Sequence, residues 1–332
     1  MNESAIDHIF EQFEQLKILV VGDVMIDSYV WGSVDRISPE APVPIVSVKD
    51  KENRLGGAAN VALNLQSLGA TPILCSVIGD DISAQHFVTL CQKNKLKTEG
   101  IIKSNHRITT VKERIMSGSQ HIVRIDHEID STLDNNSRQL LISQFEQLIK
   151  SVDAIVFQDY DKGVLDKEII EQMLSIANSN NKPTIVDPKK RNFLCYKGAT
   201  LFKPNLKELK EGLKVDFNGA DMHSVEVAIS RLKMALKVKN ALLTLSENGV
   251  YIDGEKEKKH IKAHVRKIAD VSGAGDTVVS IASLCIALNQ PAQVIAGLSN
   301  LGGGIVCEQL GVVPVDAQKL KNEAQQYGLF PN

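Results

Sequence analysis

The chain has 332 residues, of which 43% are hydrophobic and 23% charged, and its formal net charge is −2 at pH 7. That charge gives no basic face for nucleic acid or an anionic membrane, and no apolar stretch is long enough to cross a bilayer. The acidic N-terminal segment does not have the pattern of a signal peptide. Five widely spaced cysteines predict free thiols, so we expect a cytoplasmic protein.

Short apolar, β-branched runs alternate with helical patterns along most of the chain. The runs predict buried strands at 17–23, 71–79, 153–160, 182–188, 199–205 and 240–249. Helical patterns lie between them, at 58–69, 137–150 and 166–179. Strands that are buried on both faces and alternate with helices form parallel sheets. The sequence therefore predicts a three-layer α/β/α sandwich with a mostly parallel sheet, as a single domain over residues 1–332.

Two segments do not follow this alternation of strands and helices. Residues 29–54 and 107–129 alternate with a period of two and contain turn residues. They predict a small antiparallel sheet, inserted as a lid over the strand ends. In parallel sheets, ligands bind beyond the carboxyl ends of the strands. The sequence places polar groups there, at Gly22-Asp23, Asp159-Tyr160-Asp161, Asp187-Pro188-Lys189 and Asn205.

The segment RLGGAANVALNLQSLGA (54–70) places two glycines directly before a helix. Gly56 and Gly57 allow the backbone to approach a ligand closely, and Asn60 offers both the donor and the acceptor that a sugar hydroxyl needs. The alternative is a tight turn in which Asn60 has only a local capping role.

The segment DVSGAGDT (270–277) opens a second apolar helix. Gly273, Ala274 and Gly275 allow several backbone N–H groups to point at one spot, where the helix dipole also favours negative charge. Such an arrangement suits a phosphoryl group in transfer, and Asp276 could accept the proton of an attacking hydroxyl. The alternative is an ordinary glycine-rich helix start, in which Asp276 interacts only with the dipole.

With these two motifs in this order, the chain from ILVVGDVMID to LGVVPV resembles the ribokinase/PfkB carbohydrate kinase family. The resemblance implies ATP-dependent phosphorylation of a sugar hydroxyl with Mg²⁺, and Asp276 as the base. A monovalent cation is a further candidate cofactor. In this family two lids often pack together in a dimer, for which Ile45, Val46 and Val48 are candidate contacts.

The resemblance also suggests roles for other residues. Asn205 and Glu208 match an N-x-x-E element that organises Mg²⁺ and its waters, although the same pattern predicts a helix capping box. The segment TLSENG and a late helix suggest Ser246, Glu247, Gly249 and Asn300 for ATP. Asp27 is a candidate for the sugar hydroxyls, whereas Asp23 is either a ligand residue or a structural cap.

Several stretches, above all RISPEAPVP (36–44), resemble the kinases that phosphorylate D-glycero-β-D-manno-heptose 7-phosphate at the anomeric hydroxyl, for lipopolysaccharide precursors. A sugar that already carries a phosphate needs cations, and Arg114 and Lys189 are the strongest candidates among Arg36, Lys112, Arg114, Arg124, Lys162 and Lys189. Lys203 stands where fused relatives often have a smaller residue.

No nucleotidyl-transfer motif follows the kinase region, so we expect the stand-alone form. The alternatives are a kinase for another sugar or sugar phosphate, and a catalytically silent sugar-binding regulator.

Overall fold

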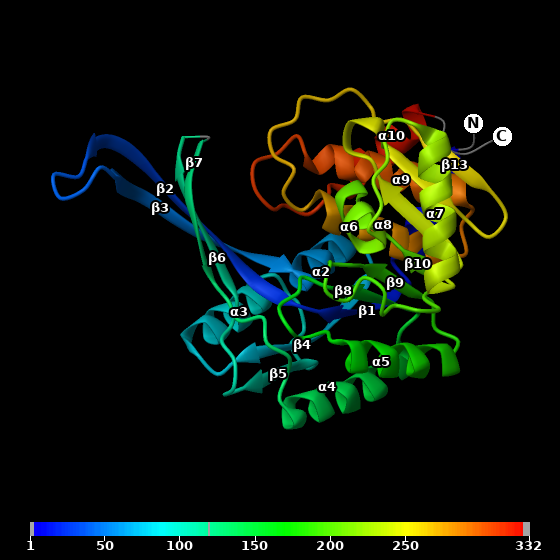
Figure 1. The fold of residues 1–332 in the computed structure, drawn as a ribbon, viewed down its shortest axis with the longest axis horizontal. Helices are drawn as coiled ribbons and strands as arrows, with labels where there is room; N and C mark the ends of the chain where they lie inside the picture. Colours follow the sequence, from blue (N-terminus) through cyan, green and yellow to red (C-terminus); the bar gives the residue numbers. More distant parts are fainter. Residues whose placement is uncertain (1–2, 119, 328–332) are drawn as a thin grey trace.

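The computed structural model describes residues 3–118 and 120–327, as an α/β body from which a four-stranded sheet extends (Figure 1). The body contains a nine-stranded sheet in the order β13-β12-β11-β10-β9-β8-β1-β4-β5. Its strands are β1 (Lys17–Gly22), β4 (Thr71–Gly79), β5 (Ile101–Ser104), β8 (Ala154–Gln158), β9 (Thr184–Asp187), β10 (Leu201–Phe202), β11 (Asn240–Thr244), β12 (Val250–Asp253) and β13 (Lys258–Ile261). All neighbours pair in parallel except β11 with β12 and β12 with β13, so the predicted mostly parallel sheet is confirmed.

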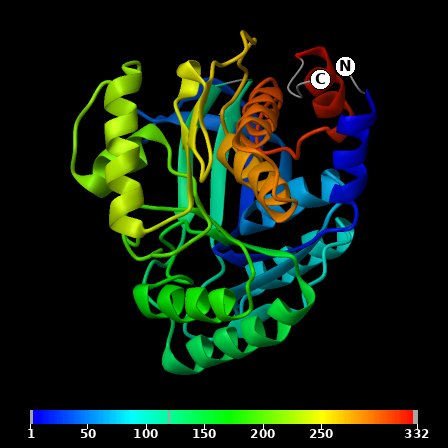
Figure 2. The same ribbon diagram turned by 90° about the vertical axis from the view of Figure 1, so that its right-hand side faces the viewer.

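Helices cover both faces of this sheet, because each central strand is apolar on both sides. Ile18 and Val20 of β1 pack into one hydrophobic core, whereas Leu19 and Val21 pack into the other. The first core includes α1 (Glu3–Phe13), α2 (Ala58–Ser67), α3 (Ile82–Lys93), α8 (Ala274–Ala287), α9 (Ala292–Val306) and α10 (Ala317–Gln326). The second includes α4 (Asn135–Leu148), α5 (Lys167–Ser179), α6 (Leu206–Leu213) and α7 (Met222–Leu236). Figure 2 shows α7 on the opposite side of the sheet from α8 and α9.

Most predicted elements occur where the sequence places them, with differences at their ends. The run 199–205 contains only the two-residue strand β10, because Pro204 has no N–H group for a further ladder bond. Two short 3₁₀ turns complete the body, η1 (Ile149–Ser151) and η2 (Ser246–Asn248). Over the described parts of the chain, none of the helices is both long enough and apolar enough to span a membrane.

The lid is a four-stranded sheet in the order β3-β2-β6-β7, built from β2 (Val24–Ile37), β3 (Pro44–Gly57), β6 (Val111–Ser117) and β7 (Gln120–His127). The two outer pairs are antiparallel, but the central pair, β2 with β6, is parallel. The prediction of a wholly antiparallel lid is therefore wrong. The reason is that β2 and β6 both start at the body and run outward, each returning through its own hairpin (Figure 1).

The base of the lid lies closer to the body than the sequence predicts. β2 starts at Val24 and pairs there with Gly57, rather than beginning near residue 29. Asp27 and Gly56 thus belong to a paired strand ribbon and not to loops. Gly57 adopts a φ of 60°, and a Cβ atom there would lie 2.3 Å from the Asp23 carbonyl oxygen, so this junction between lid and body requires glycine.

Candidate active site

Three strands of the body end in buried polar residues at the same edge of the sheet. β8 ends with Gln158, β9 ends with Asp187, and Lys203 directly follows β10. These side chains are 0%, 4% and 2% exposed, respectively. Parallel strands bring their carboxyl ends to one edge, where α8 places Asp276 in its first turn, also buried.

The Asp276 carboxylate is held by three neutral donors. Asn60 Nδ2 donates to Oδ2 over 2.7 Å. Gln158 Nε2 and the Tyr160 hydroxyl donate to Oδ1 over 3.0 Å and 2.8 Å. These donors fix the orientation of the carboxylate, and each comes from a different segment: α2, the end of β8 and the loop after it.

Burial raises the pKa of Asp276 to about 6, because desolvation disfavours the charged form. The hydrogen bond from Asn60 opposes this shift, the negative charge of Asp187 adds to it, and Tyr160 and Lys203 oppose it again. A carboxylate with a pKa near the working pH combines good proton affinity with substantial ionisation, which is the property of an effective general base.

Asp187 lies beside Asp276 and shares a donor with it. The Gln158 amide, which binds Asp276, also donates to Asp187 Oδ2 over 3.1 Å. On the other side, Lys203 Nζ lies 2.9 Å from Asp187 Oδ1. The sequence predicts no role for Gln158 or Lys203, and both belong to this buried network.

The start of α8 faces the same space. Gly273, the N-cap, has a φ of 81°, so the chain enters the helix through a left-handed turn that favours glycine. A Cβ atom at Gly275 would lie 3.7 Å from Lys203 Nζ and 3.8 Å from Asp187 Oδ2. The Ala274 N–H donates to the Val271 carbonyl over 3.3 Å, within its own turn. The predicted glycine-rich helix mouth therefore opens onto the buried cluster.

Asn205 and Glu208 form the predicted capping box at the start of α6. The Asn205 side chain accepts from the Glu208 N–H, and Glu208 Oε2 accepts from the Asn205 N–H, both over 2.8 Å. Lys189 Nζ lies 2.5 Å from Glu208 Oε1 and 5.3 Å from the centre of the Tyr160 ring. Lys189, expected at the sugar phosphate, therefore pairs with the N-x-x-E glutamate.

The residues at this edge fit a magnesium ion that is held mainly by water and phosphate. No cluster of three or more His, Cys, Asp or Glu side chains suited to a metal occurs among the residues that the structure describes. The buried carboxylates of Asp187 and Glu208 are nevertheless ligands of the kind that Mg²⁺ prefers. Mg²⁺ usually binds one or two such groups together with substrate phosphates, so a protein cage is not required.

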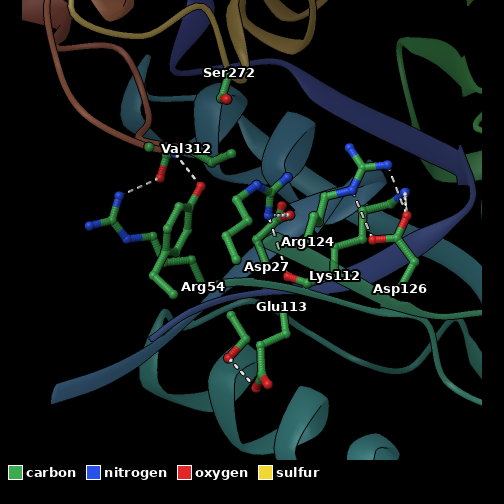
Figure 3. Close-up of polar contacts among 12 residues, drawn as sticks. Asp27, Arg54, Lys112, Glu113, Arg124, Asp126, Ser272 and Val312 are labelled. Carbon is green, nitrogen blue, oxygen red and sulfur yellow. Dashed lines mark hydrogen bonds and ion pairs between the residues drawn. The ribbon is translucent and has the colours of Figure 1, made fainter. Parts of the chain in front are cut away.

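The base of the lid supplies the groups expected for the sugar. Asp27, on β2, is 4% exposed, and Arg114 Nη1 donates to its Oδ1 over 2.5 Å. A Cβ atom at Gly56 would lie 2.0 Å from Asp27 Oδ2, so glycine at this position leaves room for the carboxylate. Further out, Lys112 Nζ and Arg124 Nε lie 3.6 Å and 2.9 Å from Asp126 (Figure 3).

The lid is also joined to the body on the side of α8. The Val312 N–H donates to the Tyr29 hydroxyl over 3.2 Å, and Arg54 Nη1 donates to the Val312 carbonyl over the same distance (Figure 3). Asp270, at the start of the glycine-rich segment, accepts from the Gly311 N–H over 2.9 Å. The loop before α10 thus connects the lid base to the mouth of α8.

The residues expected to line ATP lie at the end of β11 and on α9. Ser246 and Glu247 are exposed in η2, and Gly249 ends that turn with a φ of 85°. β11 lies next to β10, and Thr244 forms an isolated parallel bridge with Asn205. The Asn300 side chain donates to the Lys262 carbonyl over 2.9 Å.

Asp23 has the structural role that the sequence left open. Its carboxylate accepts from the N–H groups of Tyr160, Lys162 and Val164, over 2.8 to 3.1 Å. These bonds hold the loop that positions the Tyr160 hydroxyl on Asp276. Asp23 therefore acts on the site through backbone geometry.

A buried carboxylate beside a glycine-rich helix mouth, at the strand ends of an α/β sandwich, is the arrangement of a phosphotransferase. The sequence model of the pfkB family of carbohydrate kinases matches residues 15–318, so the chain belongs to this family. It is a kinase that transfers a phosphoryl group to a sugar hydroxyl.

The similar proteins agree with this assignment. Bifunctional protein HldE of Aliarcobacter butzleri is 41% identical over 297 residues, and that of Helicobacter pylori strain HPAG1 is 37% identical over 296 residues. These matches cover 89% of this chain but only 61% and 63% of the two relatives, so the chain spans about six tenths of their length.

Among solved structures, phosphofructokinase-2 from Escherichia coli with substrates and products has a TM-score of 0.78 at 18% identity, covering 94% of this chain and 99% of that one. Arabidopsis thaliana ribokinase with ribose and ATP has a TM-score of 0.72 at 14% identity, covering 92% and 98%. At these identities, the similarity establishes the fold.

The pH dependence of activity should report on Asp276. A base must be deprotonated, so kcat/KM should fall as the pH drops through about 6. Tyr160→Phe removes a hydrogen bond that lowers this pKa, so the acidic limb should move to higher pH. Tyr196→Phe is the matched control, because the Tyr196 hydroxyl binds Asp159 instead, over 2.7 Å. If the acidic limb of the pH profile is unchanged in Tyr160→Phe, its assignment to Asp276 is wrong.

Proposed function

We propose that this kinase uses ATP to phosphorylate the anomeric hydroxyl of D-glycero-β-D-manno-heptose 7-phosphate, giving the 1,7-bisphosphate for lipopolysaccharide precursors. The observation that carries the chemistry is the buried Asp276 carboxylate at the mouth of α8, held by Asn60 and Tyr160. Support for the heptose comes from the stretches around RISPEAPVP and from the HldE relatives.

In the proposed mechanism, Asp276 removes the proton from the anomeric hydroxyl as that oxygen attacks the γ-phosphorus of ATP. Asn60 orients Asp276 and can accept or donate to a sugar hydroxyl, and Asp27 binds further hydroxyls from the lid base. The start of α8, at Gly273 to Gly275, stabilises the charge of the transferring group. Bound Mg²⁺, beside Asp187 and Glu208, would neutralise phosphate charge.

The sugar phosphate is proposed to lie against the lid base, where basic side chains gather. Lys112 and Arg114 alternate with Glu113 on β6, so both lie on the same face of the strand, and their side chains are 14% and 13% exposed. Asp126 and Glu128 lie within 3.6 Å and 3.3 Å of Lys112 Nζ and hold it in place. A forked guanidinium such as that of Arg114 suits phosphate oxygens.

A panel of sugars and sugar phosphates in an ATP-consumption assay tests this function. We expect the highest kcat/KM with heptose 7-phosphate and a bisphosphate product. Asp276→Asn should keep the fold and ATP binding but lose about three orders of magnitude or more in kcat, because the amide cannot accept the proton. Preference for fructose 6-phosphate or ribose would overturn the substrate, and near-normal kcat in Asp276→Asn would overturn the base.

Gly275→Ala tests whether glycine at this position is required for folding stability or for phosphoryl transfer. A methyl group at this position would meet Lys203 and Asp187 at ordinary van der Waals distances, and alanine favours helix over glycine by roughly 1 kcal/mol. The melting temperature should therefore stay the same or rise. The methyl would nevertheless occupy the proposed phosphoryl position, so kcat should fall more than tenfold. Full activity would show that the phosphoryl group lies elsewhere.

The proposal includes a homodimer formed through the lids. The lid carries exposed apolar side chains, among them Ile37 at 69% and Val48 at 61% exposure, next to Ile45 and Val46. Contact with a second lid would cover these groups. Light scattering at micromolar concentration should give twice the chain mass, and Val48→Glu should give the monomer. A monomeric wild-type protein would contradict the dimer.

A further inference from the structure

The segment 262–271 joins β13 to α8 without regular secondary structure. At its start, the Lys262 carbonyl accepts a hydrogen bond from the side chain of Asn300, a residue that the sequence suggests for ATP. At its end, the chain enters the mouth of α8, where we propose that the phosphoryl group is stabilised. The path of this segment therefore decides how the two proposed nucleotide contacts lie relative to each other.

The segment exposes its large apolar side chains and buries a cation. Val265 is fully exposed, and Ile268 and Val271 are also exposed. The side chain of Arg266, by contrast, is only 7% exposed. Apolar side chains outside and a cation inside gain little from the hydrophobic effect. The conformation of the segment therefore depends on polar contacts.

Arg266 forms such contacts with two carboxylates from different elements. Its Nη1 atom donates to Glu308 Oε1 over 2.9 Å and to Glu323 Oε1 over 3.2 Å, and its Nη2 atom donates to Glu323 Oε2. Glu308 follows α9, and Glu323 lies on α10. The rings of His264 and Tyr327, 4.0 Å apart, join the segment to the end of α10 a second time.

The backbone of α9 leaves room for the Arg266 side chain. Gly304 lies in this helix, and a Cβ atom there would be 2.6 Å from Arg266 Nε and 3.0 Å from its Cδ. Glycine within a helix costs about 1 kcal/mol relative to alanine. Ion pairs of a buried guanidinium add little net stability in return, because desolvation offsets much of the attraction, but their planar geometry fixes one conformation. The arrangement therefore suits the ordering of the segment better than the stabilisation of the fold.

We propose that Arg266 is a positioning residue that, through Glu323 and Glu308, holds the segment 262–271 in the conformation that binds ATP. Helix α10 thereby supports the nucleotide site without touching the nucleotide. This inference rests on the proposed use of ATP. When the ion pairs are lost, the segment populates other conformations, and the apparent affinity for the nucleotide falls with the fraction that stays competent to bind.

Nucleotide binding without sugar tests this role. Arg266→Gln removes the cation, and Glu323→Gln removes the charge of its partner on α10. Calorimetry with Mg²⁺ and the β,γ-imido analogue of ATP should show the affinity reduced about tenfold in the first variant and at least about threefold in the second, because the segment must then be ordered on binding. At saturating ATP, kcat and the KM for the sugar substrate should change less than about twofold, because only nucleotide binding is weakened.

Gly304→Ala tests the same role while Arg266 itself stays unchanged. The added methyl group would displace the Arg266 side chain from its carboxylates. The affinity for the analogue should therefore fall at least about threefold, as in Glu323→Gln. An affinity equal to that of the wild-type protein would contradict the proposal.

Lys321→Gln is the matched control, because it removes a different ion pair of the same helix. Lys321 Nζ lies 2.6 Å from Asp7 Oδ1 and joins α10 to α1, so its loss should leave the affinity for the analogue unchanged. If this control lowers the affinity as much as Glu323→Gln, or if Arg266→Gln binds the analogue as tightly as the wild-type protein, the role of Arg266 is wrong. If the wild-type protein does not bind the analogue, the proposed use of ATP is wrong as well.

Discussion

The Asp276 carboxylate meets donors from two segments that are far from it and from each other in the chain, and the candidate active site depends on that meeting. Asn60 reaches it from α2, and Gln158 and Tyr160 reach it from the end of β8. The strand order places β8 between β1 and β9, so α8 can lie over the strand ends where these donors emerge. A shift in any of these elements would leave a buried carboxylate without its donors, which is costly.

The lid is continuous with this arrangement and not merely attached to it. β1 passes through Asp23 into β2, so one chain segment forms part of the central sheet, binds the loop that carries Tyr160, and continues to Asp27, which we propose for the sugar. Gly56 and Gly57 allow β3 to pass close to Asp27 and to Asp23 before α2 begins. The two glycines that the sequence associates with ligand binding therefore act first by allowing the lid and the body to approach each other.

The sequence predicts those features that a local pattern encodes. Glycines at a helix start indicate the positions of Asn60 and Asp276. Apolar runs predict the strands, and their alternation with helical patterns predicts the α/β architecture. The roles of Gln158 and Lys203 are not predicted, because in the sequence each is simply a residue at the end of a strand. Only the strand order brings Gln158 to Asp276 and Lys203 to Asp187. The parallel pairing of β2 with β6 is not predicted from the sequence for a similar reason. Alternation predicts two hairpins, and only their common origin at the body makes their central strands parallel.

The three buried carboxylates at this edge of the sheet differ in the charge of the groups that donate to them. Asp187 and Glu208 each contact a lysine, so a positive charge lies beside each of these two carboxylates. Within residues 3–118 and 120–327, the side chains that donate to the Asp276 carboxylate are those of an asparagine, a glutamine and a tyrosine. A cation in direct contact would hold its proton affinity low, whereas neutral donors orient the carboxylate and allow burial to raise its pKa to about 6. Neutral donors thus suit the base role that we propose for Asp276, whereas the two lysines lie on carboxylates for which we propose no such role.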